Sequence, residues 1–201
     1  MRGQILQYHA IAGEVASGDL SDGQTAATLL GDLEVTFGVS DGTVTVNESA
    51  TVVRPDVPVT NGALHRLDGV LLPPVGLTDF TDRELSSTDT QAGDTLVVDG
   101  SSFPEGGGFI VLHDQDELQN QGAIASIVGV SEYLEPGIHN EVEVALDEDI
   151  SSTATIGAMP HADTDGDQTY DFQSSGGATD GPYTLNGSAI IDFGTLTISS
   201  P

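Results

Sequence analysis

The chain has 201 residues and a formal net charge of -28, because 32 acidic residues face only four basic ones. All four basic residues are arginines, and the sequence contains no cysteine. Without a basic stripe to neutralise phosphates, the composition excludes a nucleic-acid-binding protein and a polybasic membrane-surface protein. Disulfides and thiolate metal sites are also excluded, and no apolar run is long enough for direct membrane insertion.

The acidity predicts a particular environment. At ordinary ionic strength so many carboxylates repel one another and favour expansion of the chain. Molar salt shortens the Debye length to about 3 Å and removes most of this repulsion. Strong β-branched alternation argues against disorder as the reason for the high charge. We therefore interpret the composition as an adaptation to concentrated salt, as in a halophilic organism.

The first part of the chain is predicted to contain two short helices followed by strands. The helices are expected over residues 3–10 and 24–29. Apolar residues at every second position predict strands over 33–39, 43–46, 50–53 and 63–72. An Asp-Gly pair at 41–42 indicates a hairpin between two of them.

The second part is predicted to be almost entirely β-structure. Strands are expected over residues 95–98, 109–113, 141–146, 154–158, 183–185, 188–192 and 195–198, with a helical turn at 130–134. Two prolines at 73–74 indicate a boundary. We therefore predict a first unit at 1–74, a linker at 75–88 and a second domain at 89–199. The second domain is expected to be an immunoglobulin-like β-sandwich, since about seven short strands end at Gly or Pro.

The first unit resembles the C-terminal half of a fasciclin domain over residues 5–74. The resemblance rests on the segments ILQYHAIAG at 5–13 and NGALHRLDGVLLP at 61–73. The other half of such a domain has no counterpart here. We therefore expect the chain to be a fragment of a longer protein, with a partial fasciclin-type β unit.

The resemblance implies a function as well as a fold. Fasciclin domains are extracellular adhesion and matrix modules, so it implies an extracellular or cell-surface location and a surface protein or glycan as partner. Tyr8 and His9 are the adhesion candidates that the resemblance implies. The alternative is that His9 and His65 only tie strands and turns together through hydrogen bonds, because polar groups beside apolar neighbours need partners.

The second domain resembles a β-rich domain of unknown function in surface proteins of salt-loving archaea. The similar stretches are SFPEGGGFIVLHD at 102–114, GVSEYLEPGIH at 129–139 and AMPHADTDGD at 158–167. The resemblance adds an archaeal surface protein to the expectations.

An acidic loop in this domain predicts a calcium site. Asp163, Asp165, Asp167 and Asp171 stand at positions 1, 3, 5 and 9, and the carbonyl of Thr169 stands at position 7. Such spacing turns oxygen ligands around one hard cation. The glycine position and the missing glutamate at position 12 exclude an EF-hand. The alternative is a solvated acidic turn, so Ca²⁺ is the one cofactor that the sequence suggests.

Three histidines suggest a second kind of site. His113, His139 and His161 flank predicted strands and would suit Zn or Cu if they met at one edge, in an envelope metal-binding or redox-associated module. The alternative is that they hydrogen-bond loops, with Asp114 and Asp163 as acceptors. No serine-hydrolase elbow, P-loop or zinc-protease motif is present. The leading interpretation is a non-enzymatic adhesion or structural module on the surface of a halophilic archaeon.

Overall fold

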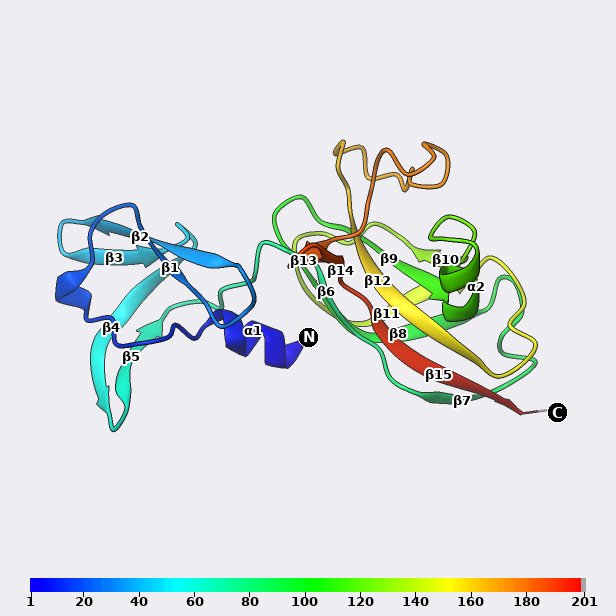
Figure 1. Cartoon of the computed structure of the whole chain (residues 1–201), viewed down its shortest axis with the longest axis horizontal. Coiled ribbons are helices and arrows are strands. Elements are labelled where there is room, and N and C mark those ends of the chain that lie inside the picture. The colour runs from blue at the N-terminus through cyan, green and yellow to red at the C-terminus, as the bar shows by residue number, and fades with distance from the viewer. Residues whose placement is uncertain (200–201) are drawn as a thin grey trace. The chain divides into compact units, whose positions relative to one another are not determined.

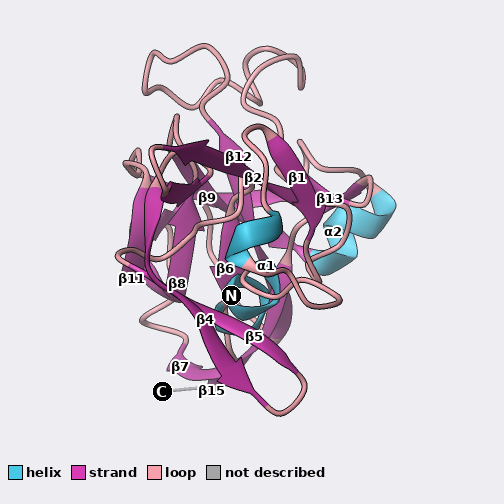
Figure 2. Cartoon of the chain, turned by 90° about the vertical axis from the view of Figure 1, so that its left-hand side faces the viewer, coloured by secondary structure: helices cyan, strands magenta, loops and turns pink. Residues whose placement is uncertain are grey.

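A computed structural model describes residues 1–199 and divides the chain into two compact units. One unit comprises Arg2–Pro73, and the other begins at Pro74. Strands dominate both units and the helices are short, as Figures 1 and 2 show. The prediction of a mainly β protein is therefore confirmed.

The first unit is an antiparallel sheet whose strands follow one another in chain order. Its elements are α1 (Arg2–Tyr8), a 3-10 turn (Ser17–Asp19), β1 (Gln24–Ala27), β2 (Glu34–Ser40), β3 (Thr43–Val46), β4 (Ala50–Val59) and β5 (Gly62–Leu67). On β2 and β3 the buried residues alternate with more exposed ones, as a sheet with one covered face requires. The short helix predicted at 24–29 is wrong, because pairing with β2 makes this segment the edge strand β1.

The second unit is built on one sheet of eight strands. Its strands are β6 (Leu77–Asp79), β7 (Arg83–Ser86), β8 (Thr95–Phe103), β9 (Gly108–Asp114), β10 (Ile127–Ser131), β11 (Gly137–Leu146), β12 (Ala154–Ala162) and β15 (Asp192–Ser199). They lie in the order β6-β8-β11-β10-β9-β12-β15-β7, and only the β15–β7 pair is parallel. Helix α2 (Gln115–Asn120) and a small hairpin, β13 (Thr184–Leu185) with β14 (Ser188–Ala189), complete the unit.

This sheet bends around its own core, so the fold is sandwich-like, as predicted. Val98 on β8 and Val144 on β11 pack in the same cluster as Ile110 on β9 and Ile156 on β12. Figure 1 shows β8 and β11 behind β12 and β15. An immunoglobulin domain has two separate sheets, whereas here hydrogen bonds run through all eight strands. The order of these strands sets β9 beside β12, where the second candidate site described below lies.

Two local predictions for the second unit are wrong. Residues 75–88 are not a linker, because they contain β6 and β7 at the two ends of the sheet order. Leu77 and Phe80 are buried there, so the segment belongs to the packed unit. The helical turn expected at 130–134 is instead the end of β10 followed by an extended segment in which Leu134 bridges to Gly108. Helix α2 begins after Asp114, whose carboxylate caps it.

Candidate functional site

The acidic loop after β12 brings three of its four predicted carboxylates together. Ligand oxygens of Asp165, Asp167 and Asp171 all lie within 4.8 Å of one another. A second group contains Asp163 and Asp165 together with Asp180, which the sequence interpretation missed. Asp165 belongs to both groups, so the loop offers hard oxygen ligands around one shared carboxylate. The calcium site itself stays a prediction.

Backbone amide groups already hold much of this loop in place. Asp163 accepts hydrogen bonds from the amides of Gly166 and Gln168, at 2.9 and 3.1 Å. Asp180 is fully buried and accepts from the amides of Thr164 and Asp171, at 3.0 and 2.7 Å. These bonds satisfy the buried carboxylate and tie both ends of the loop to it. A residue nine positions beyond the loop motif thus anchors it, which spacing within the motif does not indicate.

The negatively charged carboxylates of the loop repel one another. Partial loss of hydration raises the pKa of Asp165, and repulsion from Asp167, Asp180 and Asp163 acts in the same direction. Because Asp165 is exposed, solvent weakens this repulsion. A divalent cation would reverse it, so the local electrostatics favour cation binding.

A second group lies on β9 and β12, on the side of the sheet away from the main core. His113 on β9 and His161 on β12 are both fully buried, and their ring centres are 5.9 Å apart with planes inclined by 22°. Phe172 and Tyr170 pack edge-on against the His161 ring, at 5.0 and 5.5 Å between centres. The two imidazoles therefore share one closed, largely aromatic environment.

The hydrogen bonds of this pair determine its tautomers. His161 Nδ1 lies 2.6 Å from the carbonyl oxygen of Asp180, which only accepts, so Nδ1 carries the proton. His113 Nδ1 lies 2.8 Å from the hydroxyl of Ser126, which itself donates to the Ala123 carbonyl. Nδ1 of His113 is thus also the donor. In both neutral rings the lone pair is therefore on Nε2.

Neither Nε2 atom has a hydrogen-bond partner among residues 1–199, although both atoms are buried. Burial lowers the pKa of His113 to about 3 and that of His161 to about 4. For His113 the neighbouring His161 adds to this effect, whereas for His161 the carbonyl and charge of Asp180 oppose it. Both rings are therefore neutral at pH 7. An unpaired buried lone pair costs about 1–3 kcal/mol, so a fold that keeps two of them calls for an explanation.

The predicted three-histidine cluster is wrong. His139 lies on β11, where its Nε2 donates to the Glu135 carbonyl at 2.7 Å and its ring packs edge-on against Phe103. The predicted acceptors also differ, because Asp114 caps helix α2 instead of meeting a histidine. Ser126 and the Asp180 carbonyl take that role. Sequence order alone does not show which strands are neighbours in a sheet, and this accounts for both errors.

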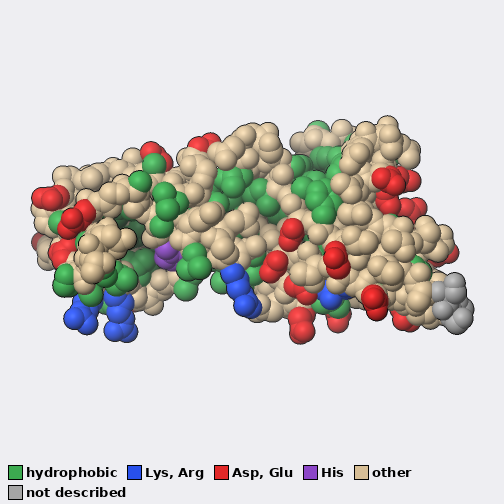
Figure 3. Space-filling view, turned by 60° about the horizontal axis from the view of Figure 1, so that its bottom comes forward, with side chains coloured by type: hydrophobic (Ala, Val, Ile, Leu, Met, Phe, Trp, Pro, Cys, Tyr) green, Lys and Arg blue, Asp and Glu red, His purple; other side chains and the backbone are tan. Residues whose placement is uncertain are grey.

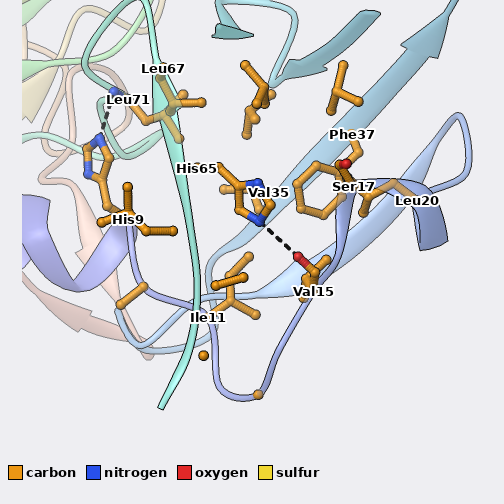
Figure 4. Close-up of a pocket in the computed structure, with 18 of the residues that line it drawn as sticks. His9, Ile11, Val15, Ser17, Leu20, Val35, Phe37, His65, Leu67 and Leu71 are labelled. Atoms are coloured by element: carbon orange, nitrogen blue, oxygen red, sulfur yellow. Dashed lines mark hydrogen bonds between the residues drawn. The ribbon is translucent and has the colours of Figure 1, made fainter. Parts of the chain in front are cut away.

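The first unit contains an open groove of about 590 Å³ lined mainly by apolar side chains, shown in Figure 4. Tyr8 lies at its inner side and is only 1 % exposed. Its hydroxyl donates to the Glu34 carbonyl at 3.2 Å and accepts from Asn47 at 2.8 Å. Tyr8 thus fills the interior, while His9 is exposed. The adhesion role of Tyr8 and His9 stays a prediction, and of these two residues it is His9 whose side chain is exposed.

The two histidines of this unit join segments that are far apart in the sequence. His9 Nδ1 donates to the Ile5 carbonyl at 2.8 Å, and its Nε2 accepts from the Leu71 amide at 3.1 Å. His65 Nε2 lies 2.8 Å from the Val15 carbonyl. Both ring nitrogens of His9 are used in this way, as the hydrogen-bonding alternative predicted.

Exposed apolar side chains surround the groove region. Val53 and Val59 on β4 and Leu64 on β5 are 51, 47 and 50 % exposed. Arg54 lies opposite Arg66 in this hairpin, so half of the arginines in the chain are here. Figure 3 shows how rare basic side chains are among the acidic ones. Val59 and Leu64 also line the groove, so exposed apolar side chains and groove are continuous there, as is typical of an interaction surface.

Comparison with known proteins assigns both units. Residues 2–73 match the fasciclin domain, and residues 84–197 match a domain of unknown function, DUF7282. No solved structure matches the chain.

The relatives include surface proteins of a salt-loving archaeon. Cell surface glycoproteins 2 and 1 of Haloarcula hispanica are each 38 % identical to the chain, over 136 and 135 residues. The alignments cover 62 and 61 % of this chain but only 14 % of either relative. Protein sll1483 of a Synechocystis species is 42 % identical over 72 residues, which are 36 % of this chain and 38 % of that protein.

Neither helix of the described residues has the length and apolar character needed to span a bilayer.

The DUF7282 match extends over more than half of the chain and coincides with the eight-stranded sheet. The fasciclin match coincides with the five-stranded sheet. The chain therefore belongs to the DUF7282 family and carries a fasciclin domain in front of that domain.

Proposed function

We propose that this chain is a non-enzymatic adhesion or structural module on the surface of a halophilic archaeon, with a surface protein or glycan as its partner. The observation that carries the proposal is the fasciclin unit with its exposed apolar hairpin, β4–β5, beside an open groove. The names of the archaeal relatives and the net charge of -28 support the surface location and the salt adaptation.

The hairpin is the feature to test. In molar NaCl, beads coated with the protein should bind to haloarchaeal cells or to their isolated envelopes. Val53→Asp together with Leu64→Asp should reduce that binding at least about tenfold, because an interface loses affinity when charges enter its apolar centre. Ile138→Asp is the matched control, since Ile138 is 47 % exposed on β11 of the other unit.

His9→Ala tests the second adhesion candidate in the same assay. Loss of binding with an unchanged melt would support a contact role for His9. A lower melting midpoint would instead reflect its bond from the Leu71 amide. If coated beads bind no better than uncoated ones, the adhesion proposal fails.

We also propose that the loop around Asp165 binds Ca²⁺ and thereby stabilises the second unit. The supporting observation is the pair of carboxylate groups that share Asp165, with Asp180 anchored in the interior. The carbonyl of Thr169 remains a proposed ligand. A solvated acidic turn is the competing interpretation, and thermal melts with and without Ca²⁺ separate the two.

A further inference from the structure

The histidine pair of the second unit combines features that a structural role does not require. His113 and His161 are fully buried, and each uses Nδ1 as a donor to the surrounding protein. Each leaves an unprotonated Nε2 without a partner among the described residues. Metal-binding histidines show this arrangement, because the second-sphere acceptor holds the ring and keeps Nε2 free for the ion.

The separation of the rings allows one ion to meet both. An imidazole nitrogen lies about 1 Å from its ring centre and about 2 Å from a bound metal, so two rings on one ion have centres at most about 6 Å apart. The observed distance of 5.9 Å lies within this limit. A pair of nitrogen ligands suits a monovalent soft ion better than Zn²⁺, which takes four ligands in tetrahedral geometry.

Charge and surroundings also favour a monovalent ion. Phe172 and Tyr170 pack against His161, so the ion would lie among aromatic rings. Asp180 is the buried carboxylate beside this ring, and one negative charge balances a single positive charge. Met159 occupies the strand position between the two histidines, facing Val111 across the ladder, and a thioether is a soft group.

We infer that His113 and His161 form a buried binding site for Cu(I), with Nε2 of each ring as the ligand and with Ser126 and the Asp180 carbonyl positioning the rings. The site is separate from the proposed adhesion surface, which belongs to the other unit. It also differs from the acidic loop, whose oxygen ligands suit hard cations.

The test uses the full chain under anaerobic conditions in molar sodium sulfate, because chloride binds Cu(I) and would compete. Cu(I) is added from a coloured chelator that reports the amount transferred, and ¹⁵N NMR follows the ring nitrogens. We expect one Cu(I) per chain, with the Nε2 signals of His113 and His161 shifting together while those of His9, His65 and His139 stay in place. Transfer without those two shifts, or no transfer, would overturn the inference.

Three variants sharpen the result. His113→Gln and His161→Gln should each lower the Cu(I) affinity by about 100-fold or more, and Ser126→Ala should lower it by about tenfold through loss of ring positioning. The matched control is His139→Gln, which should leave both the affinity and the stoichiometry unchanged. If a buried variant does not fold, as judged by circular dichroism in the same salt, the NMR result on the unaltered chain decides.

Zn²⁺ in the same titration tests the choice of a monovalent ion. We expect Zn²⁺ to leave both Nε2 signals unshifted at concentrations where Cu(I) saturates the site. If Zn²⁺ moves both signals and Cu(I) does not, the assignment to Cu(I) is wrong.

Discussion

The two units of this chain differ both in net charge and in how completely they bury their apolar side chains. The first unit, at 2–73, carries nine acidic residues and three arginines, for a net charge of -6. The second, at 74–201, carries 23 acidic residues and one arginine, for a net charge of -22. The first leaves a groove and apolar side chains open, whereas the second encloses a large core.

In this chain the unit with the larger net charge also has the larger buried core. The fraction of surface buried on folding rises with domain size, so the larger unit has more burial to offset the repulsion between its carboxylates. The smaller unit has little excess burial but also little net charge. Salt dependence should therefore reside mainly in the second unit, and the apolar contact surface in the first.

The largest expected effect is that of salt. On transfer from 3 M to 0.1 M NaCl, amide hydrogens of the second unit should lose protection at least about tenfold more than those of the first, because screening at molar salt removes most of the repulsion. Hydrogen exchange followed by mass spectrometry measures both units in one sample. An equal loss of amide protection in both units would contradict the claim that salt dependence resides mainly in the second unit.

A fall in pH should also destabilise the second unit more than the first. The pKa values of His113 and His161 lie at about 3 and about 4, below the value near 6.5 of an unfolded chain. The unfolded state thus binds more protons, and stability that is fully present above about pH 6.5 is lost as the pH falls through this window. Lowering the pH from 7 to 5 should reduce the free energy of unfolding of the second unit by about 2 kcal/mol for each of the two histidines.

Thermal melts at fixed molar salt, taken at pH 7 and pH 5, measure this loss. His139→Gln serves as the control, since this histidine is partly exposed and bonded to the Glu135 carbonyl. Replacement of His161 by Gln should flatten the pH dependence. A melting midpoint of the second unit that does not change between the two pH values would contradict the prediction.

Matched core truncations compare the packing of the two units. Leu112→Ala, at a fully buried position of β9, should lower the free energy of unfolding of the second unit by about 2–5 kcal/mol. Leu71 lines the open groove, so water and neighbouring side chains can fill the space that Leu71→Ala leaves. This substitution should therefore lower the free energy of unfolding of the first unit by only about 1–2 kcal/mol. Denaturant titration in molar salt measures both. A larger loss at Leu71 would show that the groove is closed in solution.

The smallest expected effect is that of calcium. Millimolar Ca²⁺ at fixed molar NaCl should raise the melting midpoint of the second unit and leave the first unchanged, since binding to the native state alone stabilises it by mass action. Asp165→Asn together with Asp167→Asn should abolish the rise without lowering the metal-free midpoint, because both residues are exposed. If wild type and variant melt alike with and without Ca²⁺, the loop is a solvated turn.

The sequence by itself determined the β class, the acidic character and the family resemblances. Strict alternation located β3 at Thr43–Val46 to the residue, because one buried face repeats every second position. The spacing of Asp165, Asp167 and Asp171 also anticipated their grouping, since these residues lie close together along one loop. Local patterns suffice where the interacting groups are near in sequence.

Only the tertiary structure decided the remaining features. The segment 24–29 has the composition of a helix and became β1 because β2 offered it a partner. Residues 77–79 and 83–86 were too short to show a period, yet the sheet order gives them partners in β8 and β15. His113 and His161 meet because β9 and β12 are neighbours, although 47 residues separate them in the chain. Such contacts depend on strand order, which local periodicity does not contain.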